Sequence, residues 1–531
     1  MHILAERKYG HPDTLLDQGG KMHSLRIKPQ LILLLVGISL LVLAVQPQQL
    51  ALSAPNTYVV SNTKDDGANG SLRKAINAAN ANLGQDTIVF NIPFVDPNYY
   101  AAGGYFTIPL LSPLPNLTDP LGTIIDGTSQ GANKGDTNPL GPEIEIVPAL
   151  EPFANPFFIL DSDNNMIKGL ALEGSEKSAI KVYGSSNRIS QNYLGVDPKG
   201  LSCWKNLNGV EIRPYSDSNV IENNIIASKN DGIILSDSQL NLISGNIIGV
   251  NVNKMIFSNI VKPDDFGNDN IGIHLKDNSV QNTIKENYIA DNHRYGIYLE
   301  GTGTQKNILY SNTITANGWH GIGIYYGAHH NGIGKVTPPI YGNVITKNGW
   351  SGVAIVENSN KNTVGFNIIQ ENNFYGVDVV DSADNFVMSN TLSHNGVHTA
   401  SAGVHVNGLT ATGNHWLDNR IYDNNDKGIQ LVNGANEGIT PPTIHSASCT
   451  LVQGTSACPG CIVFVYSDQG DQGRKLERMV YADAGGNFTS SGPFFGPNIT
   501  VTQQDGNANA SSFSLPYINA CMKFFIPILI K

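Results

Sequence analysis

The sequence predicts an all-β protein: a parallel β-helix with a short N-terminal capping helix, followed by a small C-terminal β-sandwich. Two observations carry this prediction. Asparagine supplies 43 of the 275 residues between 164 and 438, which disfavours helices because its side chain competes with the backbone for hydrogen bonds. The same segment repeats a short phrase every 23 to 31 residues, a period that indicates a solenoid.

Residues 1–53 are predicted to be a leader. Arg26 and Lys28 precede an apolar run at residues 31–45 and a small-residue stretch at 51–54, in the order of a secretory signal peptide, and Met22 is an alternative start. Because the run is shorter than the roughly 20 residues of a spanning helix, we expect a secreted or cell-surface protein. Membrane attachment through an uncleaved run is the alternative.

Residues 54–160 are predicted to form the N-terminal cap and the first coils. A solenoid exposes apolar core and unpaired strand edges at its ends, so it needs a cap. Residues 72–82 have helical character, and Ser71 stands where an N-cap belongs. We therefore expect this helix to cover the first coil.

Residues 161–438 are predicted to be the repeating coils. Each phrase has one Asn, a second Asn five positions later, and then a Gly followed by alternating apolar residues, which is typical of strands of three to five residues. A propeller is the alternative, but its blades need four strands in 40 to 50 residues. The first Asn residues of successive phrases are Asn287, Asn312, Asn343, Asn367, Asn390 and Asn419.

The N-terminal residues resemble a known motif. Residues 70–76, Gly-Ser-Leu-Arg-Lys-Ala-Ile, resemble the motif of exported bacterial β-helix proteins named for the string Cys-Ser-Leu-Arg-Glu-Ala (CSLREA), with Gly70 and Lys74 as departures. The Asn repeats resemble the right-handed parallel β-helix superfamily that includes pectate lyases. The resemblance implies a right-handed coil and export. It does not choose an activity, because the superfamily holds lyases, hydrolases, epimerases, adhesins and inert scaffolds.

Residues 441–531 are predicted to form a β-sandwich, because short strand-like runs alternate there with Gly-rich turns. The segment resembles the Ig-like modules that follow β-helices in exported proteins. Residues 524–531 are predicted to be an edge strand, with a sorting tail as the alternative. Cys203 lies apart, and four cysteines that fit an oxidising compartment cluster at the C-terminal end: Cys449, Cys458, Cys461 and Cys521.

One corner of four consecutive coils is predicted to carry aromatic side chains. Rows of this kind bind polysaccharides because the apolar faces of sugar rings pack on aromatic rings. The alternative is a stack that only covers a corner of the core. The candidate carbohydrate-binding residues are Tyr295, Trp319, His320, Trp350, Phe374 and Tyr375.

A second column, two residues after the corner Gly, suggests a shallow groove beside the aromatic row. It reads His274, Tyr298, Gly323, Ala354, Asp378 and His405. Asp378 and His405 are candidate catalytic residues as base and acid, with ordinary solvated surface as the alternative. Arg294 is the third candidate, because the resemblance implies lyases that use Arg or Lys as base together with Ca²⁺.

A third column, Asp277, Glu357 and Asp381, offers oxygen ligands for Ca²⁺, although surface charge is the favoured interpretation, so no cofactor is assigned. The net charge of −11 and the lack of a basic stripe argue against nucleic acid as a partner. We expect the protein to bind a polysaccharide or cell-wall glycan. The alternatives are a polysaccharide lyase or hydrolase, the hydrolase disfavoured because the coils lack paired Asp residues, and a structural surface protein or adhesin.

Overall fold

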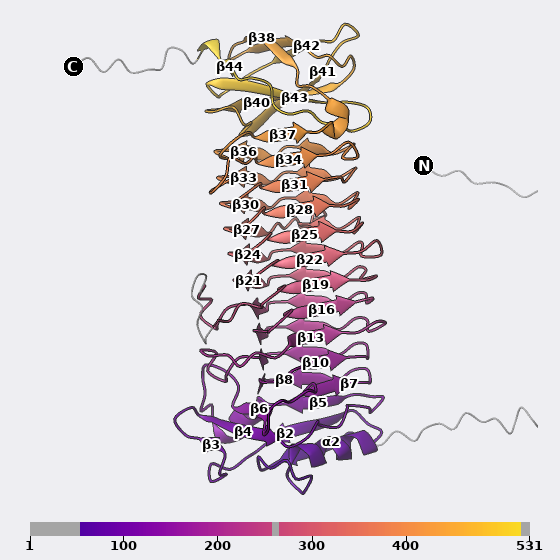
Figure 1. Cartoon of the computed structure of the whole chain (residues 1–531), viewed down its shortest axis with the longest axis vertical. Helices are drawn as coiled ribbons and strands as arrows, with labels where there is room; N and C mark the ends of the chain where they lie inside the picture. Colours follow the sequence, from indigo (N-terminus) through magenta and orange to yellow (C-terminus); the bar gives the residue numbers. More distant parts are fainter. Residues whose placement is uncertain (1–53, 257–264, 522–531) are drawn as a thin grey trace, which may run out of the picture. The chain divides into compact units, whose positions relative to one another are not determined.

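The structure is a computed structural model that describes residues 54–256 and 265–521. Figure 1 shows the short strands of successive coils lying above one another. The predicted leader, the alternative start at Met22 and the predicted edge strand at 524–531 lie outside the described residues. Within those residues, no helix has the length and apolar character needed to cross a membrane.

Three sheets, A, B and C, wind around one core, and each complete coil gives one strand to each sheet. Neighbouring strands within them are parallel, except for the antiparallel pair β3 and β4 at the start of sheet B. Sheet A consists of β1 (Thr57–Val60), β2 (Asp86–Phe90), β5 (Thr123–Asp126), β8 (Met166–Lys168), β11 (Arg188–Ser190), β14 (Val220–Glu222), β17 (Leu242–Ser244), β20 (Thr283–Lys285), β23 (Ile308–Tyr310), β26 (Gly332–Ile333), β29 (Thr363–Gly365), β32 (Phe386–Met388) and β35 (His415–Leu417).

Sheets B and C follow sheet A in each coil. Sheet B consists of β3 (Tyr99–Tyr100), β4 (Tyr105–Leu110), β6 (Ile144–Pro148), β9 (Leu170–Leu172), β12 (Tyr193–Leu194), β15 (Ile225–Ile226), β18 (Ile247–Ile248), β21 (Tyr288–Ala290), β24 (Thr313–Thr315), β27 (Val344–Thr346), β30 (Ile368–Gln370), β33 (Thr391–Ser393) and β36 (Arg420–Tyr422). Sheet C consists of β7 (Phe158–Leu160), β10 (Ser178–Val182), β13 (Asn208–Ile212), β16 (Ile233–Ser236), β19 (Ile273–Lys276), β22 (Ile297–Glu300), β25 (Ile322–Tyr325), β28 (Val353–Val356), β31 (Val377–Val380), β34 (Val404–Asn407) and β37 (Ile429–Val432).

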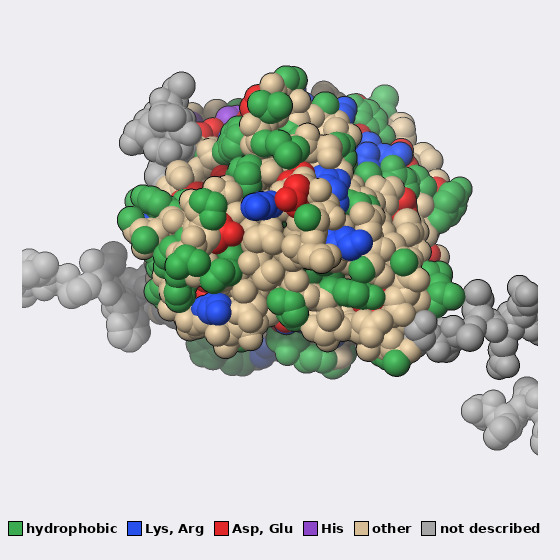
Figure 2. Space-filling model, turned by 90° about the horizontal axis from the view of Figure 1, so that it is seen from below, with side chains coloured by type: hydrophobic (Ala, Val, Ile, Leu, Met, Phe, Trp, Pro, Cys, Tyr) green, Lys and Arg blue, Asp and Glu red, His purple; other side chains and the backbone are tan. Residues whose placement is uncertain are grey.

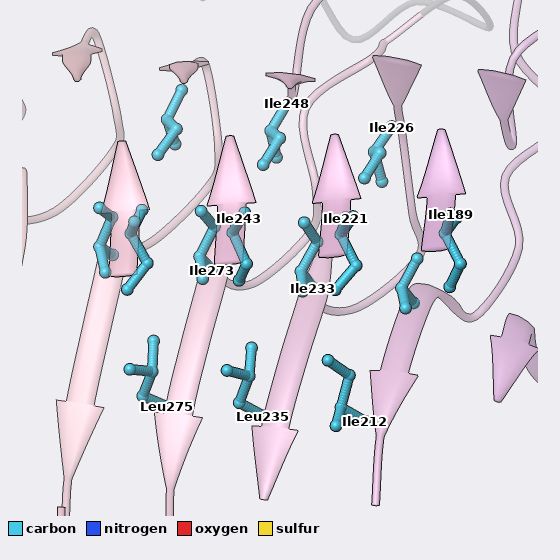
Figure 3. Close-up of a cluster of buried hydrophobic side chains, with 14 of the residues drawn as sticks. Ile189, Ile212, Ile221, Ile226, Ile233, Leu235, Ile243, Ile248, Ile273 and Leu275 are labelled. Carbon is cyan, nitrogen blue, oxygen red and sulfur yellow. The ribbon is translucent and has the colours of Figure 1, made fainter. Parts of the chain in front are cut away.

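The core is a set of aliphatic ladders. Ile189, Ile221 and Ile243 pair in register through β11, β14 and β17 of sheet A, and they are almost completely buried. Figure 3 shows them pointing into the same interior as Ile233 and Leu235 of sheet C. The alternation of inward aliphatic and outward residues predicted from the sequence is therefore confirmed for these coils.

Buried Asn ladders at the corners join each coil to the next. The side-chain amide of Asn343 donates to Asn367 Oδ1 at 2.9 Å and to the carbonyl of Leu309 at 2.8 Å, while its own Oδ1 accepts from Asn312. The second Asn of the phrase does the same, as in Asn348 donating to Asn372 Oδ1 at 2.9 Å. The Asn amides of successive coils thus form continuous ladders, which satisfy polar groups that the turns bury.

The first coil is covered by helix α2 (Leu72–Ala81), as predicted. The Ser71 side chain caps it by accepting from the backbone N–H of Lys74, and Leu72, Ala75, Ile76 and Ala79 are its buried residues. A short helix, α3 (Ser129–Lys134), packs near the same end. Figure 2 views this end from below and shows scattered hydrophobic and charged side chains among uncharged polar and backbone atoms.

Two small antiparallel sheets follow the last coil and a short 3₁₀ turn, Ala435–Gly438. They have a hydrophobic core of their own that includes Val463 and Val501. The first consists of β38 (Thr443–Ala447), β39 (Leu451–Thr455) and β42 (Asn487–Ser491), and the second of β41 (Lys475–Tyr481), β40 (Ile462–Asp468), β43 (Asn498–Gln504) and β44 (Tyr517–Ile518).

The C-terminal sheets are tied to one another and to the coils by polar contacts. A disulfide joins Cys458 and Cys461, and the backbone N–H of Cys449 lies 2.9 Å from Cys521 Sγ. Gln472 extends one Asn ladder, because its Oε1 accepts from the backbone N–H of Asn424 at 2.9 Å. The C-terminal segment thus satisfies polar groups that the last coil would otherwise leave open.

Candidate functional site

The strand register places the second predicted column on sheet C as expected. His274 pairs with Tyr298, Tyr298 with Gly323, Gly323 with Ala354, Ala354 with Asp378, and Asp378 with His405. The flanking residues of each strand, such as Val377 and Val379, point into the core. The column therefore lies on the outer face of sheet C.

The aromatic corner consists of two columns that stack from coil to coil. In the outer column, Trp319 N–H donates to Arg294 O at 2.8 Å, Trp350 N–H to Trp319 O at 2.9 Å, and Phe374 N–H to Trp350 O at 3.2 Å. We call Arg294, Trp319, Trp350 and Phe374 the outer column, and their chain neighbours Tyr295, His320, Ser351 and Tyr375 the inner column. Trp350 and Phe374 are 46% and 36% exposed, whereas Tyr295 and His320 are buried.

The rings of the outer column stack on one another along the axis of the coils. The Trp319 and Trp350 ring centroids are 5.4 Å apart with planes 14° from parallel, and Trp350 and Phe374 are 6.0 Å apart at 43°. Rings that stack in this way turn much of their faces toward each other. The outer column is therefore partly a structural stack, and it is not a flat row of free ring faces.

The predicted groove is filled at its middle. Tyr295 and Tyr298 lie over Gly323, since a Cβ there would be 2.8 Å from Tyr295 Cε1 and 3.0 Å from Tyr298 Cδ2. Sequence spacing gave the small residue correctly, but not the direction in which the neighbouring rings point. The open space lies farther along, in a cavity of about 340 Å³ lined by His320, Tyr325, Trp350, Ser351, Val356, Phe374, Asp378 and Val380.

His320 enters this cavity as a neutral ring. Its Nδ1 accepts from the backbone N–H of Ser351 at 3.2 Å, so the proton of the neutral ring is on Nε2, which lies 3.4 Å from the Tyr325 hydroxyl oxygen. Burial lowers the pKa of His320 to about 4. The ring therefore offers an N–H donor without a charge at neutral pH.

Asp378 and His405 lie together at one wall of the cavity. His405 Nδ1 is 2.7 Å from Asp378 Oδ1, and the His405 ring stacks on Tyr375 with centroids 4.1 Å apart. Asp378 lines the cavity and its side chain keeps 16% exposure, whereas His405 is buried. A hydrogen-bonded carboxylate and imidazole of this kind can accept and donate protons.

Arg294 does not join the other two candidate catalytic residues. Its guanidinium carbon lies 4.7 Å from the centroid of the Trp319 ring, in a cation–π contact. It is in the coil of β22, three coils or about 14 Å from the coil of Asp378. The structure thus brings together two of the three predicted residues.

The column of Asp277, Glu357 and Asp381, for which surface charge was the favoured interpretation, forms no ion-binding group among the described residues. Asp277 accepts from the Ser236 hydroxyl, and Asp381 accepts from the Thr410 hydroxyl at 3.2 Å. Three possible ligands do cluster elsewhere, at Asp265, Asp269 and His293. The ammonium of Lys205 already lies 2.9 Å from Asp269 and 3.7 Å from Asp265, so this acidic pair has its own cation.

The coils match a known protein family. Residues 156–337 and 271–444 match the family described as "Right handed beta helix region", and together these ranges cover more than half of the chain. The chain belongs to this right-handed β-helix family. A comparison with curated proteins gives no match.

Three solved structures are similar to this chain at low sequence identity. The A-module of the mannuronan C-5 epimerase AlgE4 of Azotobacter vinelandii is 14% identical with a TM-score of 0.44, over 71% of this chain and 91% of that one. The periplasmic alginate epimerase AlgG is 12% identical with a TM-score of 0.35, over 66% and 76%. The Dettilon tailspike protein gp208 is 12% identical with a TM-score of 0.41, over 85% and 88%.

Two charged clusters of this β-helix protein were missed by the sequence analysis. His274 lies between carboxylates, with Nδ1 3.0 Å from Asp231 Oδ2 and Nε2 3.0 Å from Glu300 Oε1. These carboxylates raise the pKa of His274 against the opposing effect of burial. The second cluster is the buried pair Glu145 and Glu173 on the outer face of sheet B.

The Glu145–Glu173 pair makes the stability of the fold depend on pH. Burial, together with the hydrogen bond and charge of Glu145, raises the pKa of Glu173 from 4.5 to about 9. The folded protein therefore holds a proton that the unfolded chain releases. The contribution of this proton to the free energy of unfolding is fully present below pH 4.5. It is lost as the pH rises through about 9, by at most about 1.4 kcal/mol per pH unit.

Replacing Glu173 by glutamine is expected to make the free energy of unfolding depend less on pH, because the amide stays neutral at every pH. Urea midpoints measured between pH 5 and 9 check the prediction. The midpoint of the variant should rise relative to that of the wild type as the pH increases. Glu286→Gln, at a side chain that is 57% exposed, should keep the wild-type slope. Equal slopes for Glu173→Gln and wild type would contradict the prediction.

Proposed function

We propose that this protein binds a polysaccharide or cell-wall glycan outside the cytoplasm, in the cavity beside the aromatic corner. The observation that supports this most is the cavity itself, in which the exposed rings of Trp350 and Phe374 form part of the wall. Most of the lining is aromatic or aliphatic, with a few polar groups among it, as in sites for small organic ligands. The Cys458–Cys461 disulfide supports an oxidising compartment.

The polar groups of the cavity suit sugar hydroxyls. His320 Nε2–H is a donor, the Tyr325 hydroxyl donates and accepts, and the Asp378 carboxylate accepts. The edge and remaining face of Trp350 suit the apolar face of a pyranose ring. The proposal therefore seats one or a few sugar units in the cavity, with the rest of the polymer along the outer column.

A panel of soluble and insoluble polysaccharides tests the proposal. The purified protein is incubated with each polymer, with and without Ca²⁺, and depletion from solution is measured together with unsaturated or reducing products. We expect saturable depletion by at least one polymer. Depletion by none of them would overturn the proposal.

An enzyme is the second candidate, and the Asp378–His405 contact at the cavity wall favours it. In a lyase or hydrolase this pair would serve as base and acid at the bound sugar. Product release in the panel experiment would support this candidate. Turnover that is undiminished in Asp378→Ala would remove Asp378 from the chemistry.

The third candidate is a structural surface protein or adhesin, in which the coils display the C-terminal sheets. This candidate is supported if no glycan binds, because the aromatic corner would then serve only to cover the core. The Ig-like character of residues 441–531 and the CSLREA-like motif at residues 70–76 stay predictions of the sequence.

A further inference from the structure

The cavity beside the aromatic corner has the chemistry of a cation site. Its aromatic side chains, Tyr325, Trp350 and Phe374, come from three successive coils, and Asp378 supplies a carboxylate. Aromatic rings attract cations through the negative potential of their faces, most strongly where the cation leaves water. Val356 and Val380 complete the lining with apolar groups that keep water out.

The described lining of the cavity contains no Lys or Arg side chain that would compete for the carboxylate. His320 is neutral, because its Nδ1 accepts from Ser351 N–H and burial lowers its pKa. His405 holds one oxygen of Asp378, so the pair is anionic when the imidazole is neutral and has no net charge when it is protonated. In neither state does the cavity carry a net positive charge.

The outer column already holds one cation in this manner. Arg294 sits over Trp319 at 4.7 Å, and Trp319 in turn stacks on Trp350 at 5.4 Å. The same stack therefore accepts a guanidinium at one end, while Trp350 and Phe374 line the open cavity at the other.

These observations also indicate what the cavity disfavours. The carboxylate of a uronic acid seated there would lie beside Asp378 in surroundings where a like charge is poorly screened. A neutral hydroxyl or acetamido group carries no positive charge for the rings of Tyr325, Trp350 and Phe374 to attract. An ammonium group would meet both the rings and the carboxylate.

We propose that this cavity takes an organic ammonium group, carried by an amino-sugar unit of the glycan. The inference rests on the proposed glycan binding and adds the chemical class of the bound unit. The same ammonium chemistry is present in choline, which lacks the sugar ring. The experiment below separates the two sources.

Calorimetric titration of the full protein with oligosaccharides of equal length tests the inference, slightly below neutral pH where amines carry a proton. The ligands are glucosamine, N-acetylglucosamine and galacturonate oligomers, with choline alone as a fourth. We expect the glucosamine oligomer to bind about tenfold more tightly than its N-acetylated counterpart, with the galacturonate oligomer weakest. Choline alone should bind more weakly than the glucosamine oligomer, because it makes no sugar contacts.

A charge-removing variant assigns the preference to the cavity. Asp378→Asn should bring the affinity ratio of glucosamine to N-acetylglucosamine oligomers close to one. Glu371→Gln is the matched control, because it removes one negative charge from the same coil at a side chain that is 43% exposed and pairs with Lys347. It should leave the ratio unchanged.

The outcomes separate this inference from the proposed function. Equal binding of glucosamine and N-acetylglucosamine oligomers, or preference for galacturonate, would overturn the ammonium site and keep glycan binding. Choline binding as tightly as the glucosamine oligomer would overturn the amino sugar as the source. Failure of these ligands and of the whole polysaccharide panel would overturn the proposed function as well.

Discussion

Replacing Asn343 by leucine is expected to lower the free energy of unfolding by about 3 kcal/mol. The substitution removes the Oδ1 that accepts both the backbone N–H and the side-chain amide of Asn312, and the amide that donates to Leu309 O. The N–H of Asn312 would then be buried without a partner. Leucine has the same branched shape and is not smaller than asparagine, so the loss does not come from a cavity.

Urea denaturation followed by circular dichroism measures this loss as a lower midpoint. Asn278→Ala is the control, since Asn278 is exposed in a turn of the coils, and its midpoint should stay near that of the wild type. An Asn343→Leu protein that unfolds at the wild-type midpoint would mean that the Asn ladder contributes nothing to stability.

The repeat explains why so much of the fold could be predicted. Residues at equivalent positions of successive phrases lie above one another, so counting two positions from each corner Gly was enough to find that Asp378 pairs with His405. The same counting placed the Asn residues in ladders. In a solenoid, sequence spacing is also spatial register.

The site could be predicted only in part, because spacing gives position and not the direction of side chains. Counting placed a small residue at Gly323, but the rings of Tyr295 and Tyr298 cover it. It placed Trp319 and Trp350 at one corner, but left open whether their rings form a sugar-binding row or a stack. Ring orientation depends on rotamers that neighbouring coils select together.

Tyr325 of the cavity and the Glu145–Glu173 pair of sheet B both have a signal in the sequence. Tyr325 ends β25, two positions after Gly323 of the outward column, and this spacing is a sequence signal for its place beside the corner. Glu145 and Glu173 are 28 residues apart, which is within the period of one coil. Two carboxylates separated by one coil period are therefore a sequence signal for this pair.

Replacing Trp350 by alanine is expected to weaken glycan binding by about 30-fold, or about 2 kcal/mol, with the fold intact. Trp350 lines the cavity and contacts Phe374, Trp319 and His320. Its loss removes the ring on which a sugar would pack and also opens the cavity wall. Because Trp350 is 46% exposed, its contribution to folding is smaller than that of a core residue.

Affinity electrophoresis or calorimetry with the polymer identified by the panel measures the loss. Tyr183→Ala is the matched control, because Tyr183 follows β10 of sheet C and is 47% exposed, but it lies in an earlier coil away from the cavity. The control should bind as the wild type does, so that removing exposed aromatic area alone is not the cause. If Trp350→Ala binds the polymer with wild-type affinity while both variants unfold at the wild-type midpoint, the aromatic corner is a structural stack and the glycan site must lie elsewhere.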